Sequence, residues 1–293
     1  MPPASNPLRG ALYALAAYSL YSLADITIKF LGGSYGPAQI MFFAGIASFP
    51  LLALLMMTDP VAGSLRPVYP VWTAARMVIA VANGFLVAYA FANLPLSQAY
   101  AIFFLMPLMI CLLAVPLLGE PIDLPRGLAV GVGLAGVIVV LRPGQMPLQL
   151  AHLAAFAGAT LGALYYIILR KTGGAERMVV IMLYPLLAQT AVMAALLPLV
   201  YQPMPMLHLG LTWLMALEGF AGSLLIIAAY RLAPAVVIAP MQYVQIIIAT
   251  LFSTLYFNEP MDAYTVAGIA VIIAAGLFIM TRPKPAESGV VAN

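Results

Sequence analysis

Residues 20–33 read LYSLADITIKFLGG, and residues 161–174 read LGALYYIILRKTGG. Both stretches are apolar, and both end with a basic residue followed by Gly-Gly, so their recurrence predicts two related halves of the chain. Chance similarity is the alternative, because Leu and Gly matches between apolar segments are common. The matched positions are Leu20 with Leu161, Leu23 with Leu164, Lys29 with Arg170, and Gly32-Gly33 with Gly173-Gly174.

The later part of each half repeats as well. A residue-Pro step, an acidic Glu-Pro turn and a closing Arg-Pro step follow one another in the same order twice. In the first half these are Leu94-Pro95, Leu118-Gly119-Glu120-Pro121 and Leu141-Arg142-Pro143; in the second they are Ala233-Pro234, Phe257-Asn258-Glu259-Pro260 and Thr281-Arg282-Pro283.

The composition is that of a polytopic membrane protein. Of its 293 residues 65% are hydrophobic and 7% charged, with a mean hydropathy of +1.07. A helix of about twenty apolar residues crosses the hydrocarbon of a bilayer, and Pro and Gly interrupt the chain at that spacing. The predicted spans are 8–31, 36–57, 70–93, 97–118, 125–141, 150–170, 178–200, 210–232, 235–257 and 263–281.

These spans divide into five per half, so the predicted repeats are 8–142 and 150–282. An odd number of spans places the second repeat in the opposite orientation to the first. We therefore expect an all-α integral membrane protein of ten transmembrane helices in two inverted five-helix repeats. Secondary transporters use this architecture.

The basic residues predict the orientation. Cytoplasmic loops of membrane proteins are enriched in Lys and Arg, and a cytoplasmic N-terminus leaves only Arg142 in a loop on the other side. The sequence thus predicts a multi-pass protein of the cell inner membrane with both termini in the cytoplasm. The residues on the inner side are then Arg9, Arg66, Arg126, Arg170, Lys171, Arg177, Arg231, Arg282 and Lys284.

Three motifs resemble the drug/metabolite transporter superfamily, EamA type. They are the paired Glu-Pro turns, the Gly-rich spans that end in Leu141-Arg142-Pro143 and Thr281-Arg282-Pro283, and the segment 92–99, ANLPLSQA. The resemblance covers nearly the whole chain. It implies a central substrate cavity surrounded by spans one, three, four, six, eight and nine.

The first span, with Asp25 and Lys29 and followed by Gln39, is similar to a bacterial branch of that family. Members of this branch have been assigned substrates as different as S-adenosylmethionine, riboflavin and amino acids. The branch often has an arginine in span two after the Gln, where this chain has Ala44 and Gly45. Inferences that depend on that cation do not apply here.

Four charged residues lie within predicted spans. Asp25 and Lys29 are four residues apart, share a helix face and are expected to form an ion pair, with Lys29 either a substrate partner or reaching to the interface. Arg76 and Glu218 occupy similar places in the two repeats. Intramembrane acids usually face a bundle interior or a water-filled cavity, so Glu218 is a candidate for substrate binding or ion coupling. Arg76 is a candidate too, with snorkelling to the headgroups as its alternative.

Uncharged polar side chains within spans complete the predicted site. Amides in hydrocarbon need partners, which a substrate or a neighbouring helix supplies, and tyrosines at an interface often form a belt instead. The candidates are Asn83, Tyr89, Tyr100, Tyr166, Gln242 and Gln245.

Other functional classes are less consistent with the sequence. The only histidines, His152 and His208, lie far apart, Cys111 is the only cysteine, and no Gly-x-x-x-x-Gly-Lys-Ser/Thr motif occurs. The sequence thus predicts no enzyme, metal site or cofactor. The net charge of +3 fits basic cytoplasmic loops, so no nucleic-acid partner is expected. A channel would need a filter or a ring of like charges, and an accessory subunit would leave the buried charges unexplained.

The sequence is best interpreted as that of a secondary active transporter. It would move a small organic metabolite, such as an amino acid or a related amphiphilic or zwitterionic compound, by alternating access. The alternative is uptake of a larger cofactor-type metabolite such as S-adenosylmethionine or riboflavin. A coupling proton or ion is left open.

Overall fold

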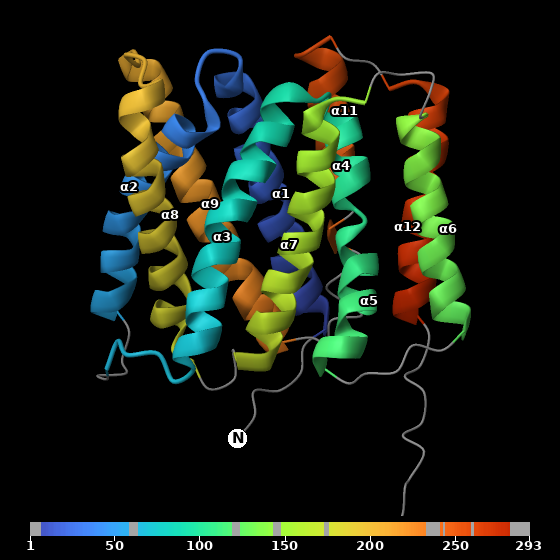
Figure 1. Cartoon of the computed structure of the whole chain (residues 1–293), viewed down its shortest axis with the longest axis horizontal. Helices are drawn as coiled ribbons and strands as arrows, with labels where there is room; N and C mark the ends of the chain where they lie inside the picture. Colours follow the sequence, from blue (N-terminus) through green and yellow to red (C-terminus); the bar gives the residue numbers. More distant parts are fainter. Residues whose placement is uncertain are drawn as a thin grey trace, which may run out of the picture.

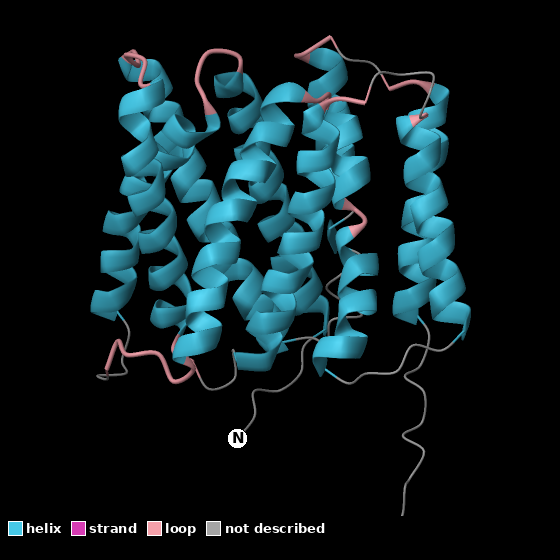
Figure 2. Cartoon of the chain, in the orientation of Figure 1, coloured by secondary structure: helices cyan, strands magenta, loops and turns pink. Residues whose placement is uncertain are grey.

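The computed structural model describes residues 7–58, 64–118, 124–142, 148–172, 176–232, 241–242, 244–258 and 261–281. The described residues form a bundle of helices joined by short loops (Figure 2). The helices are α1 (Pro7–Gly32), α2 (Pro37–Thr58), α3 (Pro70–Asn93), α4 (Leu96–Phe103), α5 (Met106–Leu118), α6 (Leu124–Leu141), α7 (Leu150–Thr172), α8 (Met178–Val200), α9 (Met206–Leu232), α11 (Val244–Leu255) and α12 (Ala263–Thr281).

Length and composition make these helices membrane spans. In the described chain, six are apolar and long enough to cross a bilayer by themselves, namely α1, α2, α3, α7, α8 and α9. Large apolar side chains such as Leu128 and Ile247 are 62% and 68% exposed, as expected where a surface faces hydrocarbon. Helices satisfy their backbone hydrogen bonds internally, which a lipid environment requires. The protein is an all-α integral membrane protein.

The observed helices follow the predicted spans closely. The bounds of α3, α8 and α12 coincide with the predicted 70–93, 178–200 and 263–281. The predicted span 235–257 is seen in part, because α11 begins at Val244 and residues 233–240 and 243 lie outside the described part.

The predicted span 97–118 consists of two helices, α4 and α5, separated at Phe104 and Leu105. The nitrogen of Leu105 donates to Ile102 O at 3.0 Å, which is a tighter turn than an α-helix. Pro107 has no N–H to donate to the carbonyl of Phe103, so the regular ladder stops there. Tyr100 consequently lies on the last regular turn before a break inside the membrane.

The helices pair across the two repeats. The most extensive contacts join α1 to α9, α3 to α7, α2 to α8 and α6 to α12, and each pair takes one helix from each half. In Figure 1 the α6–α12 pair stands at one end of the bundle and the α2–α8 pair at the other. The packing of α2 on α9 is matched by that of α8 on α3. This is the pattern of two inverted five-helix repeats around a pseudo-two-fold axis.

The bundle has two opposite faces, called the terminal face and the far face. The terminal face is the one at which α1 begins and α12 ends (Figure 1). The far face is the opposite one, at which α1 ends at Gly32 and α2 begins at Pro37.

Candidate substrate-binding site

Asp25 lies on α1 and is held by a side chain of α4. The hydroxyl of Tyr100 donates to Asp25 Oδ2 at 2.7 Å, and its oxygen is 3.2 Å from Ser22 Oγ. Tyr100 is 2% exposed and Ser22 is fully buried. A carboxylate within a span needs such a donor, since bulk water does not reach it.

Glu218 lies near the middle of α9, the helix that packs on α1. It is 9% exposed, and its Oε2 is buried without a hydrogen-bond partner in the described part of the chain. Asp25 belongs to the other helix of the α1–α9 contact, and Glu218 is among the charges that act on it. Asp25 and Glu218, called the acid pair below, therefore concentrate negative charge between α1 and α9.

The packing of α1 on α9 next to the acid pair is tight. The hydroxyl of Tyr21 donates to Ser223 Oγ at 3.2 Å. A Cβ added to Gly222 would lie 2.7 Å from Tyr21 Cε1, so only glycine permits this approach of the two helices. The sequence places Asp25 one turn after Tyr21 and Glu218 one turn before Gly222, which brings both acids to the same interface.

The predicted ion pair between Asp25 and Lys29 is wrong for this structure. Lys29 Nζ donates to the carbonyl of Leu94 at 2.7 Å and lies 5.4 Å from the ring centroid of Phe257. The two charged side chains share a face of α1, yet no contact within the described residues joins them. Lys29 connects α1 to the ends of α3 and α11, while Asp25 connects α1 to α4.

Arg76 is buried between helices and does not snorkel to the headgroups. It is 2% exposed, and its Nη2 donates to Tyr165 OH at 2.6 Å and to the carbonyl of Ile181 at 3.1 Å. The guanidinium also lies 4.6 Å from the ring centroid of Tyr165. Arg76 thus joins α3 to α7 and α8.

The remaining predicted residues are dispersed. Asn83 Oδ1 is buried without a partner in the described residues, at the α3–α7 contact formed by Gly158 and Gly162. Tyr89 stacks on Phe85 of its own helix. Tyr166 packs edge-on against Tyr165, Gln242 lies on the short turn before α11, and Gln245 is buried on α11.

Two residues that the sequence analysis did not single out contribute to these contacts. Tyr165 receives Arg76, and Phe257 underlies Lys29. A signal for Tyr165 existed in the adjacent pair Tyr165-Tyr166, one of which must face a neighbouring helix if the other faces the cavity. Nothing in the local sequence distinguishes Phe257 from other phenylalanines near helix ends.

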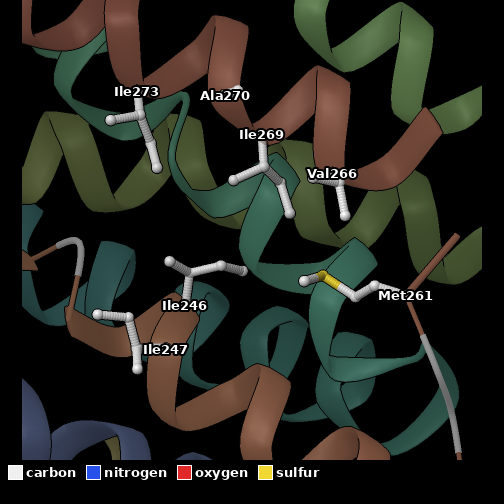
Figure 3. A pocket seen from close by; sticks show the side chains of 7 residues that line it. All are labelled: Ile246, Ile247, Met261, Val266, Ile269, Ala270 and Ile273. Carbon is white, nitrogen blue, oxygen red and sulfur yellow. The ribbon is translucent and has the colours of Figure 1, made fainter. Parts of the chain in front are cut away.

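The cavities nearby differ in chemistry. One of about 410 Å³ lies between α11 and α12 and is lined entirely by apolar side chains, including Ile246, Met261 and Ile269 (Figure 3). Another of about 220 Å³ lies between α1, α2, α8 and α9, where Ala44 and Gly45 line it together with Ser48 and Gln189. The first offers nothing to a polar group, and the second offers Ser48 and Gln189, while Asp25 and Glu218 line neither of them.

Comparison with known proteins agrees with the fold. The EamA-like transporter family matches residues 8–142 and again 149–281. The chain belongs to the EamA-like transporter family. It is accordingly a multi-pass membrane transporter of small molecules and not an enzyme.

Relatives of this EamA-like chain carry different substrates. An S-adenosylmethionine uptake transporter of Rickettsia prowazekii is 26% identical over 96% of this chain and 95% of its own length. A riboflavin transporter of Rhizobium johnstonii is 28% identical over 97% and 94%. A pseudopaline exporter of Pseudomonas aeruginosa is 24% identical over 94% and 96%. A protein of known crystal structure superposes with a TM-score of 0.67 at 21% identity, over 94% of this chain and 98% of that one, which concerns the fold alone.

Proposed function

We propose that this protein is a secondary active transporter that binds the positively charged group of a small organic metabolite at the acid pair and moves it by alternating access. The observation that carries the proposal is the buried Glu218 Oε2, which has no hydrogen-bond partner in the described chain, beside a second carboxylate on Asp25. Two neighbouring carboxylates in a low-dielectric region are costly unless a cation compensates them.

The two bases within the spans do not supply that cation in this structure. Lys29 is directed to the Leu94 carbonyl and Arg76 to Tyr165 and Ile181. A substrate ammonium or sulfonium fits the requirement. The aromatic rings around Tyr100, including Phe91 and Phe104, would pack against its apolar body.

This argument favours an amino-acid-derived metabolite with a positive centre. Amino acids and related zwitterions meet the condition, and so does S-adenosylmethionine, the substrate named for one relative. Riboflavin, named for another, carries no positive charge and meets it less well.

A second role for Glu218 is that of proton carrier. A proton neutralises the same carboxylate that a substrate cation would, so substrate and proton would compete for one site. Glu218→Gln would then abolish uptake driven by a pH gradient while exchange of substrate persists. If Glu218 is instead a direct ligand, the same change weakens binding whatever the gradient.

The location proposed is the cell inner membrane, with both termini in the cytoplasm. The support is the predominance of Lys and Arg in loops of the terminal face. In a protein lacking Cys111, a cysteine at Gln202 should react with an impermeant reagent added outside intact cells. If the cysteine reacts only after the membranes are opened, the orientation is the opposite of the one proposed.

The cation hypothesis is tested with a matched pair of ligands. S-Adenosylmethionine and S-adenosylhomocysteine differ by one methyl group and the sulfonium charge, and both keep the amino-acid ammonium, so this pair tests the sulfonium alone. We expect the first to raise the melting temperature of the purified protein more than the second, because a ligand of the folded state stabilises it in proportion to occupancy. Lysine, alanine and riboflavin complete the set and separate cationic, zwitterionic and uncharged classes.

Glu218→Gln should weaken binding of the cationic ligand at least about tenfold, which corresponds to roughly 1.4 kcal/mol. Glu176→Gln is the control, because Glu176 is also 9% exposed and its Oε2 also has no partner in the described residues, but it lies on the terminal face, where its Oε1 accepts a hydrogen bond from the nitrogen of Tyr69 at 2.8 Å. Equal binding of charged and uncharged analogues, together with unchanged affinity in Glu218→Gln, would remove the acid pair from the site.

A further inference from the structure

The far face is closed by a contact between α1 and α3. Lys29 Nζ donates to the carbonyl of Leu94, the residue that ends α3. One turn further along α1, a Cβ on Gly32 would lie 2.9 Å from the Cα of Ala92. The two helix ends therefore touch at backbone distance and are joined by one hydrogen bond.

The second repeat shows no counterpart of this helix packing in its described residues. The inverted repeat relates α1 to α7 and α3 to α9, so a symmetric structure would pack the ends of α7 and α9 together at the terminal face. Among the described residues, α7 and α9 show no packing comparable to that of α1 on α3, and the counterparts of Gly32 and Leu94, Gly173 and Ala233, lie outside the described part. At that end of α7, Lys171 instead lies 4.6 Å from a ring of Trp72, on α3.

The unmatched contacts are those within a repeat: α1–α2 and α2–α3, like α1–α3, have no counterpart of similar extent in α7–α8 and α8–α9 among the described residues. The contacts between the repeats are matched, since α1–α9 and α3–α7 are both made, as are α2–α9 and α8–α3. Repeat divergence in general would weaken several of these pairs, whereas a transporter caught in one of its two states breaks the symmetry at the gates.

We infer that this structure is the state closed at the far face, and that Lys29 on the Leu94 carbonyl is a latch that must release for the far face to open. The inference uses the transporter class of the family and is independent of the substrate proposed above.

Two features make the latch suitable for repeated opening. The carbonyls at a helix C-terminus lack intrahelical partners and carry partial negative charge, so they attract an ammonium. When the helices separate, both groups are near the membrane surface, where water replaces the bond.

Gly32 and Gly33 provide a matched pair of variants. A Cβ on Gly32 meets the backbone of Ala92, while a Cβ on Gly33 meets only the carbonyl of Phe30 at 3.6 Å, an ordinary contact. Gly32→Ala should force the α1–α3 contact apart, and Gly33→Ala should not. The two changes add the same methyl group at neighbouring positions, at the last residue of α1 and at the first residue after it.

The test is a distance measurement without substrate. Spin labels on cysteines at Ser34 and Asn93, both exposed at the far face, report the separation of the α1 and α3 ends in a protein lacking Cys111. We expect Gly32→Ala to raise the longer-distance population about tenfold, from roughly 1% to roughly 10% of molecules. Gly33→Ala should keep the distribution of the unchanged protein.

Lys29→Met tests the latch without altering the packing of Gly32. This variant can still be measured if Gly32→Ala fails to fold. It should raise the same population, and Lys29→Arg should restore most of the closed state because it retains a donor. An unchanged distance distribution in both Gly32→Ala and Lys29→Met would overturn the latch. Since no substrate is added, this result is separate from failure of the cation hypothesis.

Discussion

The α1–α9 pair and the α3–α7 pair are counterparts in the inverted repeat, yet they hold opposite charges. The first carries Asp25 and Glu218, and one carboxylate oxygen of Glu218 has no partner in the described residues. The second carries Arg76, whose Nη2 is held by Tyr165 and Ile181 while its Nε is buried without a partner in the described residues. The repeat thus duplicates helix packing but not polar chemistry. A ligand is expected where a polar group is buried and incompletely paired.

The first way to sharpen this comparison is to remove the charge from the α3–α7 pair. Arg76→Met leaves the hydroxyl of Tyr165 and the carbonyl of Ile181 without their donor. Each buried group left unpaired costs about 1–3 kcal/mol, so we expect unfolding in detergent to become easier by roughly 2–4 kcal/mol. Ligand affinity should change less than about twofold in the protein that remains folded.

A double-mutant cycle with Tyr165→Phe provides the control for Arg76. The two residues are in contact, so their effects on the free energy of unfolding should not add. Additive effects would mean that the contact contributes nothing. A large loss of ligand affinity in Arg76→Met with normal stability would move the binding site from α1–α9 to α3–α7.

The sequence predicted the frame of the molecule well. Pro and Gly breaks at intervals of one span placed the ends of α3, α8 and α12, because a bilayer fixes how many residues a helix needs to cross it. The repeat was visible in LYSLADITIKFLGG and LGALYYIILRKTGG, and Gly32 of the first stretch lies where α1 meets α3 closely.

The partners of the charged residues could not be predicted in the same way. Helical spacing placed Asp25 and Lys29 on one face of α1, but a helix face in a bundle touches several neighbours at different depths. Tyr100 reaches Asp25 from α4, and the Leu94 carbonyl reaches Lys29 from the end of α3. Which neighbouring helix each charged side chain contacts depends on interhelical distances that no local sequence pattern encodes.

One glycine on α9 and one on α7 give a second, smaller test. Gly222 faces the ring of Tyr21 of α1, and Gly162 faces Met106 of α5, whose Cε would lie 2.9 Å from an added Cβ. A tyrosine ring that is hydrogen-bonded to Ser223 yields less readily than the end of a flexible methionine. We expect Gly222→Ala to destabilise the protein by about 1–3 kcal/mol, and Gly162→Ala by clearly less.

Gly219→Ala is the control for both glycine variants, because nothing lies within 4 Å of an added Cβ there. It should leave the melting temperature unchanged or raise it slightly, since Ala favours helix over Gly. Equal losses of stability in Gly222→Ala and Gly162→Ala would show that both interfaces are equally tight. The distinction between a rigid tyrosine contact and a flexible methionine contact would then be wrong.

The smallest effect is expected where the two repeats meet in a third pair, α6 with α12, at the far face. Asp262 precedes α12, and its Oδ1 accepts a hydrogen bond from the nitrogen of Thr265 at 2.8 Å, as a helix N-cap does. Its Oδ2 pairs with Arg142, whose guanidinium lies 4.9 Å from the ring centroid of Tyr264. The hydrogen bond from Thr265, together with the charge of Arg142, lowers the pKa of Asp262.

A lowered pKa in the folded protein means that the ionised carboxylate stabilises the fold. This contribution is complete above the unfolded-state pKa of about 4 and disappears as the pH falls through the lower folded-state value.

Asp262→Ala, which removes both the cap and the charge, should cost about 1 kcal/mol at pH 7. Asp262→Asn keeps a capping oxygen and should cost less. Melting temperatures of the three proteins between pH 7 and pH 3 would measure this, and we expect the gap between the unchanged protein and Asp262→Asn to narrow below about pH 4. A gap that stays constant over this range would mean that the Arg142–Asp262 pair contributes through geometry alone, and that the α6–α12 contact depends on its apolar packing.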